Sequence, residues 1–257
     1  MELNKTYNEN CLDTMKIMPD EFIDLTVTSP PYDNLRQYKG YSFPFEDIAK
    51  ELYRVTKTGG VVVWVVSDAT DSGSETGSSL KQALYFMQCG FNLHDTMIYA
   101  KQFYVPLTHN RYEQEFEYMF VLSKGKPKTF NPLKTKTLFA GKKSTITHRK
   151  TGEEPVRGTN YGEARKEERI IGNVWWFQPN RDSKHPAVFP EKLAFAHIQS
   201  WSNEGELVYD CFMGSGSTAK AALSAKRNFI GSEISEDYCK LIDEKLEPLR
   251  NNLFTNL

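Results

Sequence analysis

Short runs of β-branched and aromatic residues alternate with longer stretches of helical periodicity along most of the chain, and this alternation limits the possible folds more than any other feature. Strands joined through helices pair in parallel, because each helix returns the chain to the same edge of the sheet. We therefore expect an α/β fold whose mainly parallel, twisted sheet is covered by helices on both faces. The predicted strands are Ile23 to Thr28, Val61 to Val66, Met97 to Ala100, Tyr118 to Leu122, Leu207 to Tyr209 and Phe229 to Ile230. The predicted helices are Phe45 to Val55, Ser79 to Gln88, Glu191 to Trp201, Thr218 to Ala225 and Glu236 to Leu249.

A length of 257 residues suits one large domain, or a domain that carries a smaller insertion. No stretch approaches the roughly 18 apolar residues of a membrane span, and the first residues lack the apolar run of a secretory signal. The four cysteines stand far apart with no C-x-x-C pair, which argues against a disulfide framework and against a zinc site. We expect a soluble, unexported, cytoplasmic protein with reduced thiols and no metal site.

The middle of the chain concentrates positive charge. Between Lys124 and Gly152 there are nine Lys or Arg residues and no Asp or Glu, although the whole chain has a formal net charge of -1. Apolar periodicity is weak there, which indicates an inserted, loop-rich module with a basic surface. A solvated surface excursion without a partner would have the same composition. A second polar stretch, Ser67 to Ser79, predicts a long mobile loop after a strand, with a lid as its alternative role.

The segment Thr28-Ser29-Pro30-Pro31-Tyr32 follows directly after a predicted strand. Two consecutive prolines fix two φ angles and remove two backbone donors, so the carbonyl groups before them have no partners in a strand ladder. A rigid turn at the carboxyl end of a parallel strand is where α/β sheets place their ligands. A serine hydroxyl, a proline carbonyl and an aromatic ring could together hold an amino group on a planar ring. A proline-stiffened loop with a packing tyrosine is the alternative interpretation.

A second candidate site is the glycine-rich segment Asp210 to Ala219, between a predicted strand and a predicted helix. The spacing Gly214-x-Gly216-x-x-Ala219 matches the dinucleotide-binding fingerprint, in which glycines let the backbone approach a ligand at a helix N-terminus. The next strand ends in Glu233, seventeen residues beyond Gly216, close to the distance at which an acidic residue reaches ribose hydroxyls. Together they predict a site for a nucleoside-containing cofactor. A charge at a helix N-terminus is the alternative role of Glu233.

The segment His185-Pro186-Ala187-Val188-Phe189-Pro190 stands directly before the predicted helix that leads into the glycine-rich segment. Phe189 and Pro190 could form the wall of an apolar part of a ligand site. An ordinary helix entry is the alternative for the segment, and a hydrogen-bonded structural role is the alternative for His185.

In this order the motifs resemble those of the S-adenosylmethionine-dependent DNA amino-methyltransferases. Thr28 to Tyr32 resembles their S/D/N-P-P-Y/F catalytic motif, Asp210 to Thr218 resembles their cofactor loop, and the segment from His185 resembles the helical motif before that loop. A catalytic motif first, a variable basic region second and a cofactor loop last is a permuted order that resembles the beta class of these enzymes. Three further segments also resemble this class. They are the lead-in Asn4 to Asp24, the turn Arg54 to Gly60 with Thr58 in place of proline, and the strand Glu117 to Gly125.

The resemblance implies a Rossmann-like methyltransferase fold in three consecutive parts. Residues 1–124 would form the catalytic half, 125–180 a basic target-recognition region, and 181–257 the cofactor-binding half. S-adenosyl-L-methionine would be the cofactor and double-stranded DNA the substrate, with lysines of the basic region on phosphates and other polar side chains on base edges. Trp175 and Trp176, at the end of this region, could contact DNA, although buried packing is the favoured role. A restriction endonuclease is a candidate functional partner, and a homodimer is a candidate assembly.

The resemblance also assigns a role to each candidate residue. Ser29 and the carbonyl of Pro30, in the turn completed by Pro31, would accept hydrogen bonds from an exocyclic amine, and Tyr32 would stack on a base turned out of the duplex. This catalysis acts by positioning, without a covalent intermediate. The remaining residues would hold or border the cofactor: Asp210, Phe212, Gly214, Gly216, Thr218, Glu233, His185, Phe189 and Pro190.

Serine in the catalytic motif favours the N4 amino group of cytosine as the methyl acceptor, since aspartate is commoner where the acceptor is adenine N6. Either side chain can bond an amino group, so adenine N6 remains the alternative. Two other classes stay open, a dinucleotide-dependent oxidoreductase and a catalytically silent DNA-binding protein. The oxidoreductase leaves Thr28 to Tyr32 and the basic segment unexplained. The silent protein is disfavoured by the intact motif residues Ser29, Tyr32, Asp210 and Glu233.

Overall fold

The computed structural model describes residues 1–31, 43–101, 111–138, 140–144, 147–148, 156–157, 162–178 and 189–254. The chain divides into two compact units. The larger unit comprises Met1–Asn131 and Asn173–Leu257, and the smaller unit comprises Pro132–Gly172. The candidate catalytic and cofactor-binding residues that the structure describes all belong to the larger unit.

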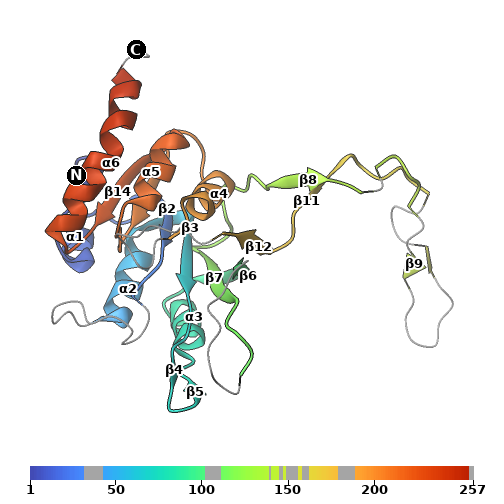
Figure 1. The fold of residues 1–257 in the computed structure, drawn as a ribbon, viewed down its shortest axis with the longest axis horizontal. Coiled ribbons are helices and arrows are strands. Elements are labelled where there is room, and N and C mark those ends of the chain that lie inside the picture. The colour runs from blue at the N-terminus through green and yellow to red at the C-terminus, as the bar shows by residue number, and fades with distance from the viewer. Residues whose placement is uncertain are drawn as a thin grey trace. The chain divides into compact units, whose positions relative to one another are not determined.

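The larger unit is built on one eight-stranded sheet with the order β1-β14-β13-β2-β3-β7-β6-β12 (Figure 1). Neighbouring strands run parallel except at β7, which is antiparallel to both β3 and β6. The expected α/β fold with a mainly parallel sheet is confirmed. All predicted strands are present, whereas β1 and β12 were not predicted. The strands are β1 Lys5–Tyr7, β2 Ile23–Thr28, β3 Thr56–Val66, β6 Asn92–Lys101, β7 Phe116–Ser123, β12 Val174–Phe177, β13 Leu207–Asp210 and β14 Asn228–Ser232.

Helices cover both faces of the sheet, as predicted. On one face α1, α2 and α3 pack in sequence against one another, and on the other face α4, α5 and α6 do the same (Figure 1). Every predicted helix is present, and the short α1 was not predicted. None of the described helices is long and apolar enough to cross a membrane. The helices are α1 Cys11–Lys16, α2 Phe45–Val55, α3 Ser78–Gln88, α4 Glu191–Trp201, α5 Ser217–Ser224 and α6 Glu236–Phe254.

The centre of the sheet is apolar on both sides. Residues 61–66 of β3 are buried without interruption, as expected of a strand with helices above and below it. On the face of α2 and α3, Trp64 lies edge-on to Phe86 of α3, with ring centroids 5.1 Å apart. On the opposite face, Leu193 and Ile198 of α4 are fully buried. These two layers hold the strands whose carboxyl ends carry the candidate motifs.

The adjacent tryptophans of β12 have opposite environments. Trp175 is 7% exposed, and its ring lies 4.6 Å from that of His197 on α4. Trp176 is 59% exposed. Buried packing is therefore correct for Trp175 and wrong for Trp176, because successive side chains of a strand point to opposite faces and β12 lies at the end of the sheet.

The sequence predicts a long mobile loop for residues 67–79, and the structure shows local pairing within it. These residues contain a hairpin of β4 (Thr70–Asp71) and β5 (Ser74–Glu75), and they end on a tight polar contact. Asp68 Oδ1 accepts the Ser79 N–H at 2.8 Å, and Asp68 Oδ2 accepts the Ser79 hydroxyl at 2.6 Å. The N-cap residue of α3 is Gly77, which offers no side chain, so Asp68 supplies the capping oxygen from outside the helix. The segment is thus anchored to the start of α3.

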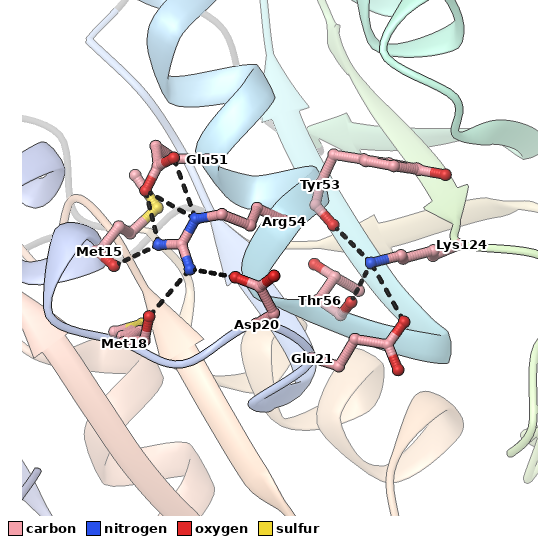
Figure 2. Close-up of polar contacts among 9 residues, drawn as sticks. All are labelled: Met15, Met18, Asp20, Glu21, Glu51, Tyr53, Arg54, Thr56 and Lys124. Carbon is pink, nitrogen blue, oxygen red and sulfur yellow. Dashed lines mark hydrogen bonds and ion pairs between the residues drawn. The ribbon is translucent and has the colours of Figure 1, made fainter.

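A cluster of ion pairs joins the amino edge of the sheet to α1 and α2 (Figure 2). The Arg54 guanidinium donates to the carbonyls of Met15 and Met18, at 2.7 and 2.9 Å, and also to carboxylates of Asp20 and Glu51. These acids raise the pKa of Arg54. The neighbouring side chain of Lys124 donates to two backbone carbonyls at the end of α2 and the start of β3, at 3.0 Å each. The lead-in before β2 is therefore fixed to the end of α2.

The smaller unit is a loop-rich insertion, as predicted. Its described strands form two short antiparallel pairs, in which β8 (Lys134–Lys136) pairs with β11 (Glu168–Ile170), and β9 (Thr147–His148) pairs with β10 (Val156–Arg157). Its exposed basic side chains include Lys134, Lys136, Lys142, Lys143, Lys166 and Arg169. Its role in target recognition stays a prediction.

Candidate active site

Three neighbouring parallel strands bring the candidate motifs to one edge of the sheet. β2 ends at Thr28, β13 ends at Asp210, and β14 ends one residue before Glu233. The register aligns Asp210 with Gly231 on β14. Because parallel strands present their carboxyl ends at the same edge, the proline motif, the glycine-rich loop and Glu233 meet there.

The carboxylate of Asp210 lies inside this edge, with its residue only 3% exposed. The hydroxyl of Thr28 donates to Asp210 Oδ1 at 2.6 Å, and the backbone N–H of Phe212 donates to the same oxygen at 3.0 Å. Burial raises the pKa of Asp210, and hydrogen bonds from Thr218, Thr28 and the Phe212 N–H oppose that rise. The site thus holds a buried acceptor through neutral donors.

The loop after Asp210 depends on glycine for its backbone shape. Gly214 has φ 53° and Gly216 has φ 81°, in the left-handed region that side chains disfavour. Gly216 is also the N-cap of α5 and makes no side-chain cap bond, and the N–H groups of the first turn of α5 point toward the loop. A Cβ atom on Gly216 would come within 2.9 Å of Ile242 on α6. The glycine spacing therefore reflects both loop geometry and helix packing.

Glu233 joins the glycine-rich loop to the start of α6. Its Oε2 accepts the Gly214 N–H at 2.8 Å, and its Oε1 accepts the Ser235 N–H at 2.8 Å. The residue is 9% exposed, so burial raises its pKa while these backbone donors oppose the rise. The same carboxylate makes both the contact at a helix N-terminus and the contact with the loop.

Two other candidates of the glycine-rich segment lie beside β2 and the aromatic core. Thr218 is buried on α5, and its hydroxyl lies 3.5 Å from the Val27 carbonyl. Phe212 is half-buried, and its ring lies edge-on to Phe43 at 5.7 Å. Phe212 therefore packs against the aromatic cluster on the α2 face.

The described part of the segment before α4 opens that helix. Pro190 is the buried N-cap residue, with its carbonyl accepting the Leu193 N–H at 2.9 Å, and Phe189 is half-buried. Lys220 of α5 binds the Glu191 carboxylate at 2.9 Å, so the first turn of α4 lies beside α5. Ordinary helix entry is therefore one role of this segment.

In the catalytic motif, Pro30 is buried, whereas Ser29 and Pro31 are half-buried. Tyr32 and His185 lie outside the described residues. The sequence places Thr28 at the start of this motif but gives it no role of its own. Its bond to Asp210 joins positions 182 residues apart, so no local pattern could indicate it.

A family model described as DNA methylase, for the N6 and N4 type, matches residues 23–244. The chain belongs to this family of DNA amino-methyltransferases. The match extends from the start of β2 into α6, so it includes both candidate motifs and the basic insertion. The oxidoreductase interpretation is thereby excluded, and the resemblance to the methyltransferases is confirmed.

Two relatives match this methyltransferase over most of their own length. The orphan methyltransferase M.BamHII of Bacillus amyloliquefaciens is 56% identical over 237 residues, which cover 88% of this chain and 89% of that protein. The type II methyltransferase M.BglII of Bacillus subtilis is 28% identical, covering 99% of this chain and 72% of that protein.

Solved structures of similar fold support the architecture. The PvuII DNA methyltransferase, titled cytosine-N4-specific, has a TM-score of 0.70 at 19% identity, covering 97% of this chain and 92% of that chain. TTHA0409 from Thermus thermophilus, a protein complexed with S-adenosyl-L-methionine, has a TM-score of 0.66 at 21% identity, covering 95% and 93%. The Rossmann-like methyltransferase fold is therefore confirmed.

S-adenosylmethionine is the methyl donor of this methyltransferase. The hydrogen-bonding groups at the carboxyl edge of the sheet match those of this molecule. The amino group and ribose hydroxyls of that molecule are hydrogen-bond donors, and its carboxylate is an acceptor. Asp210 and Glu233 provide buried acceptors, and N–H groups in the first turn of α5 are candidate donors. Among the described residues, no group of three His, Cys, Asp or Glu side chains is arranged to hold a metal ion.

Proposed function

We propose that this methyltransferase transfers a methyl group to the N4 amino group of a cytosine turned out of double-stranded DNA. The observation that carries the proposal is the 2.6 Å hydrogen bond from Thr28 to Asp210. Thr28 precedes Ser29 of the proline motif, and Asp210 begins the glycine-rich loop. An amine bound at the motif and a methyl donor bound at the loop would therefore lie side by side.

The proline motif would bind and orient the amine. The Ser29 oxygen and the Pro30 carbonyl oxygen accept its hydrogen bonds, which draw the nitrogen lone pair out of conjugation with the ring. Pro31 keeps the turn rigid, so this geometry does not have to form anew at each turnover. The bound cofactor supplies an electrophilic methyl group on a sulfonium. The contribution of these residues is thus orientation, without a covalent intermediate.

Tyr32 would hold the base outside the duplex. Extruding a base costs a few kcal/mol, and stacking one base on an aromatic ring returns about 1–3 kcal/mol. One tyrosine therefore roughly offsets the extrusion.

The cofactor would be held by residues of the glycine-rich loop and its neighbours. Asp210, Gly214 and Gly216 shape the side that receives the methionine part, and the Glu233 carboxylate accepts the ribose hydroxyls. Each carboxylate oxygen has two lone pairs, so the N–H bonds that Glu233 already accepts leave capacity for further donors. The residues proposed to border this site are Phe212, Thr218, His185, Phe189 and Pro190.

Serine at position 29 supports cytosine over adenine as the target base. The PvuII methyltransferase is titled cytosine-N4-specific, whereas YhdJ of Escherichia coli, 25% identical, is named a DNA adenine methyltransferase. Adenine N6 is therefore the second candidate acceptor.

The smaller unit would bind DNA through its exposed basic side chains. Each lysine that neutralises a phosphate releases a counterion, so binding weakens as salt rises. Replacing Lys134, Lys136, Lys142 and Lys143 together by glutamine should weaken DNA binding and flatten its salt dependence, measured by fluorescence anisotropy at several salt concentrations. An unchanged salt slope would remove the DNA-binding role from this unit.

The test of the target base is incubation with unmethylated genomic DNA and methyl-labelled S-adenosylmethionine, followed by nucleoside mass spectrometry. We expect N4-methylcytosine, with Ser29→Ala as the low-activity control. N6-methyladenine alone would keep the reaction class and overturn the choice of cytosine. Absence of any methylated base would point to an RNA substrate or to a silent DNA-binding protein.

We propose a homodimer as the assembly, covering an apolar stripe on α3. Leu80, Leu84 and Met87 are 51%, 60% and 45% exposed, on the side of the helix that is normally polar. The exposed Lys81 borders this stripe, and acidic Asp71 stands on the adjoining hairpin, so both charge signs are present for a self-complementary contact. Light scattering on Leu84→Glu should show a shift from dimer to monomer, and a wild-type monomer would refute the proposal.

A restriction endonuclease remains a candidate functional partner only, because the relative with 56% identity is named an orphan methyltransferase. We place the reaction in the cytoplasm, where DNA and the methyl donor are available together.

A further inference from the structure

We propose that Thr28 is a positioning residue for methyl transfer, whose hydroxyl couples the cofactor loop to the catalytic motif. This inference rests on the role proposed above for Asp210 in holding the cofactor. Thr28 would bind neither the cofactor nor the base. Its hydroxyl contacts the Asp210 carboxylate of the cofactor site, and its backbone continues directly into Ser29 of the catalytic motif.

The contacts of Thr28 support this role. Its side chain is completely buried, and its Oγ1 donates to Asp210 Oδ1 at 2.6 Å. The thiol of Cys211, which is also buried, lies 3.5 Å from the same Oγ1 as a donor. The hydroxyl is thus used both as donor and as acceptor, which fixes its orientation. A short bond to a carboxylate in a buried setting is among the stronger hydrogen bonds of a protein.

The same strand contains a built-in control in Thr26. Thr26 lies two residues earlier, so its side chain points to the same face of β2, and it is also completely buried. Its Oγ1 has no hydrogen-bond partner among the described residues. The two threonines therefore share burial, strand and face, and they differ in the bond to Asp210.

This difference makes two predictions about chemistry. Without the Thr28 hydroxyl, the Asp210 carboxylate loses one of its donors and can shift relative to the loop, so the cofactor should bind less tightly. The end of β2 would also lose its link to the loop, so Ser29 and the cofactor would no longer be held at a constant separation. A role in folding alone would lower stability and leave both quantities unchanged in the folded protein.

The experiment compares Thr28→Val, Thr28→Ser and Thr26→Val in the full chain. Valine keeps the shape and removes the hydroxyl, whereas serine keeps the hydroxyl. Cofactor affinity is measured by calorimetry with S-adenosylmethionine, kcat by methyl transfer to DNA, and stability by thermal unfolding without cofactor. We expect Thr28→Val to weaken cofactor affinity and to lower kcat, with kcat/KM falling about ten- to a hundredfold. Thr28→Ser should recover most of the loss, and Thr26→Val should match the wild type in both.

Unchanged cofactor affinity and kcat in a folded Thr28→Val protein would overturn the inference, and so would equal losses in Thr26→Val. If Thr28→Val does not fold, Thr28→Ser is compared with Thr28→Ala, which again differ in the hydroxyl, and equal activity of these two would overturn it. Asp210→Asn separates the two proposals. Normal cofactor affinity in Asp210→Asn would refute the role of Asp210, whereas lost affinity in Asp210→Asn beside a normal Thr28→Val would refute only the coupling.

Discussion

The carboxylates at the two edges of the sheet differ in their bonding partners. At the amino edge, Lys57 binds both oxygens of Asp24 at 2.7 Å. Arg54 binds Asp20 and Glu51 at 2.7 Å each (Figure 2). At the carboxyl edge, Asp210 and Glu233 are more deeply buried. Within the described part of the chain, their hydrogen-bond donors are hydroxyl and backbone N–H groups, and neither carboxylate forms an ion pair with a lysine or arginine.

This difference separates a structural arrangement from a functional one. The negative charge of a carboxylate that is paired with a lysine or arginine is already balanced within the protein, and its contacts join parts of the fold. Burying an ionised carboxylate without a cation beside it costs free energy, and burial therefore raises the pKa of Asp210 and of Glu233. Such a group is ready to accept further donors from a ligand. The comparison predicts that changes at the two edges will affect different measurable properties.

The largest effect is expected from Asp210→Asn. The amide keeps the shape and removes the negative charge, so kcat/KM for methyl transfer should fall about a hundredfold or more. Thermal unfolding without cofactor should be unchanged or slightly higher, because an uncompensated buried charge has been removed. A strong loss of stability at full activity per folded molecule would place Asp210 with the structural carboxylates and would break the comparison.

The next effect is expected from Arg54→Ala at the opposite edge. Truncation removes the guanidinium donor of the Met18 carbonyl and leaves the Met15 carbonyl with only the Met18 N–H, so the unfolding free energy should fall by about 2–3 kcal/mol. Chemical denaturation measures this loss, and calorimetry at low temperature should show normal cofactor affinity for the folded protein. Lys16→Ala is the matched control, since its pair with Asp13 is exposed and should contribute less than about 1 kcal/mol.

A smaller loss is expected from Lys57→Met. The pair with Asp24 is partly exposed, and Asp24 Oδ2 still accepts the Leu207 N–H at 3.0 Å. We predict a loss of about 1 kcal/mol in urea unfolding and unchanged kcat. Reduced kcat with intact stability would show that the amino edge also influences the chemistry.

The smallest effect is expected from pH, and its sign differs for folding and for binding. Asp210 and Glu233 have raised pKa values in the folded state, so between the ordinary carboxyl pKa of about 4 and the raised values the native state holds more protons than the unfolded state. Their contribution to stability therefore falls as pH rises through this window. Cofactor affinity should rise over the same window, because the carboxylates ionise. Calorimetry and urea unfolding across this pH range measure the two trends, and parallel trends would contradict the comparison.

Local patterns were sufficient for most of the elements. The periodicities predicted α2 and α4 with their observed bounds, and β2 likewise, because each forms from a continuous apolar pattern. The strands β1 and β12 were missed because they have only three and four residues, too few to show a period, and each is stabilised by pairing with a distant strand. The environment of Trp176 was misjudged for a related reason. An adjacent pair of tryptophans does not indicate which one lies on an uncovered face.

The sequence by itself determined the fold class, the proline motif, the glycine-rich loop and the membership that their order suggested, because these depend on residues that lie close together in the chain. Only the tertiary structure decided that the Thr28 hydroxyl bonds to Asp210. It also decided that, among the described residues, the two buried carboxylates have no lysine or arginine partner, whereas carboxylates at the opposite edge do. The physical reason is that strand order and register bring together residues far apart in sequence, and hydrogen bonds and burial depend on that proximity.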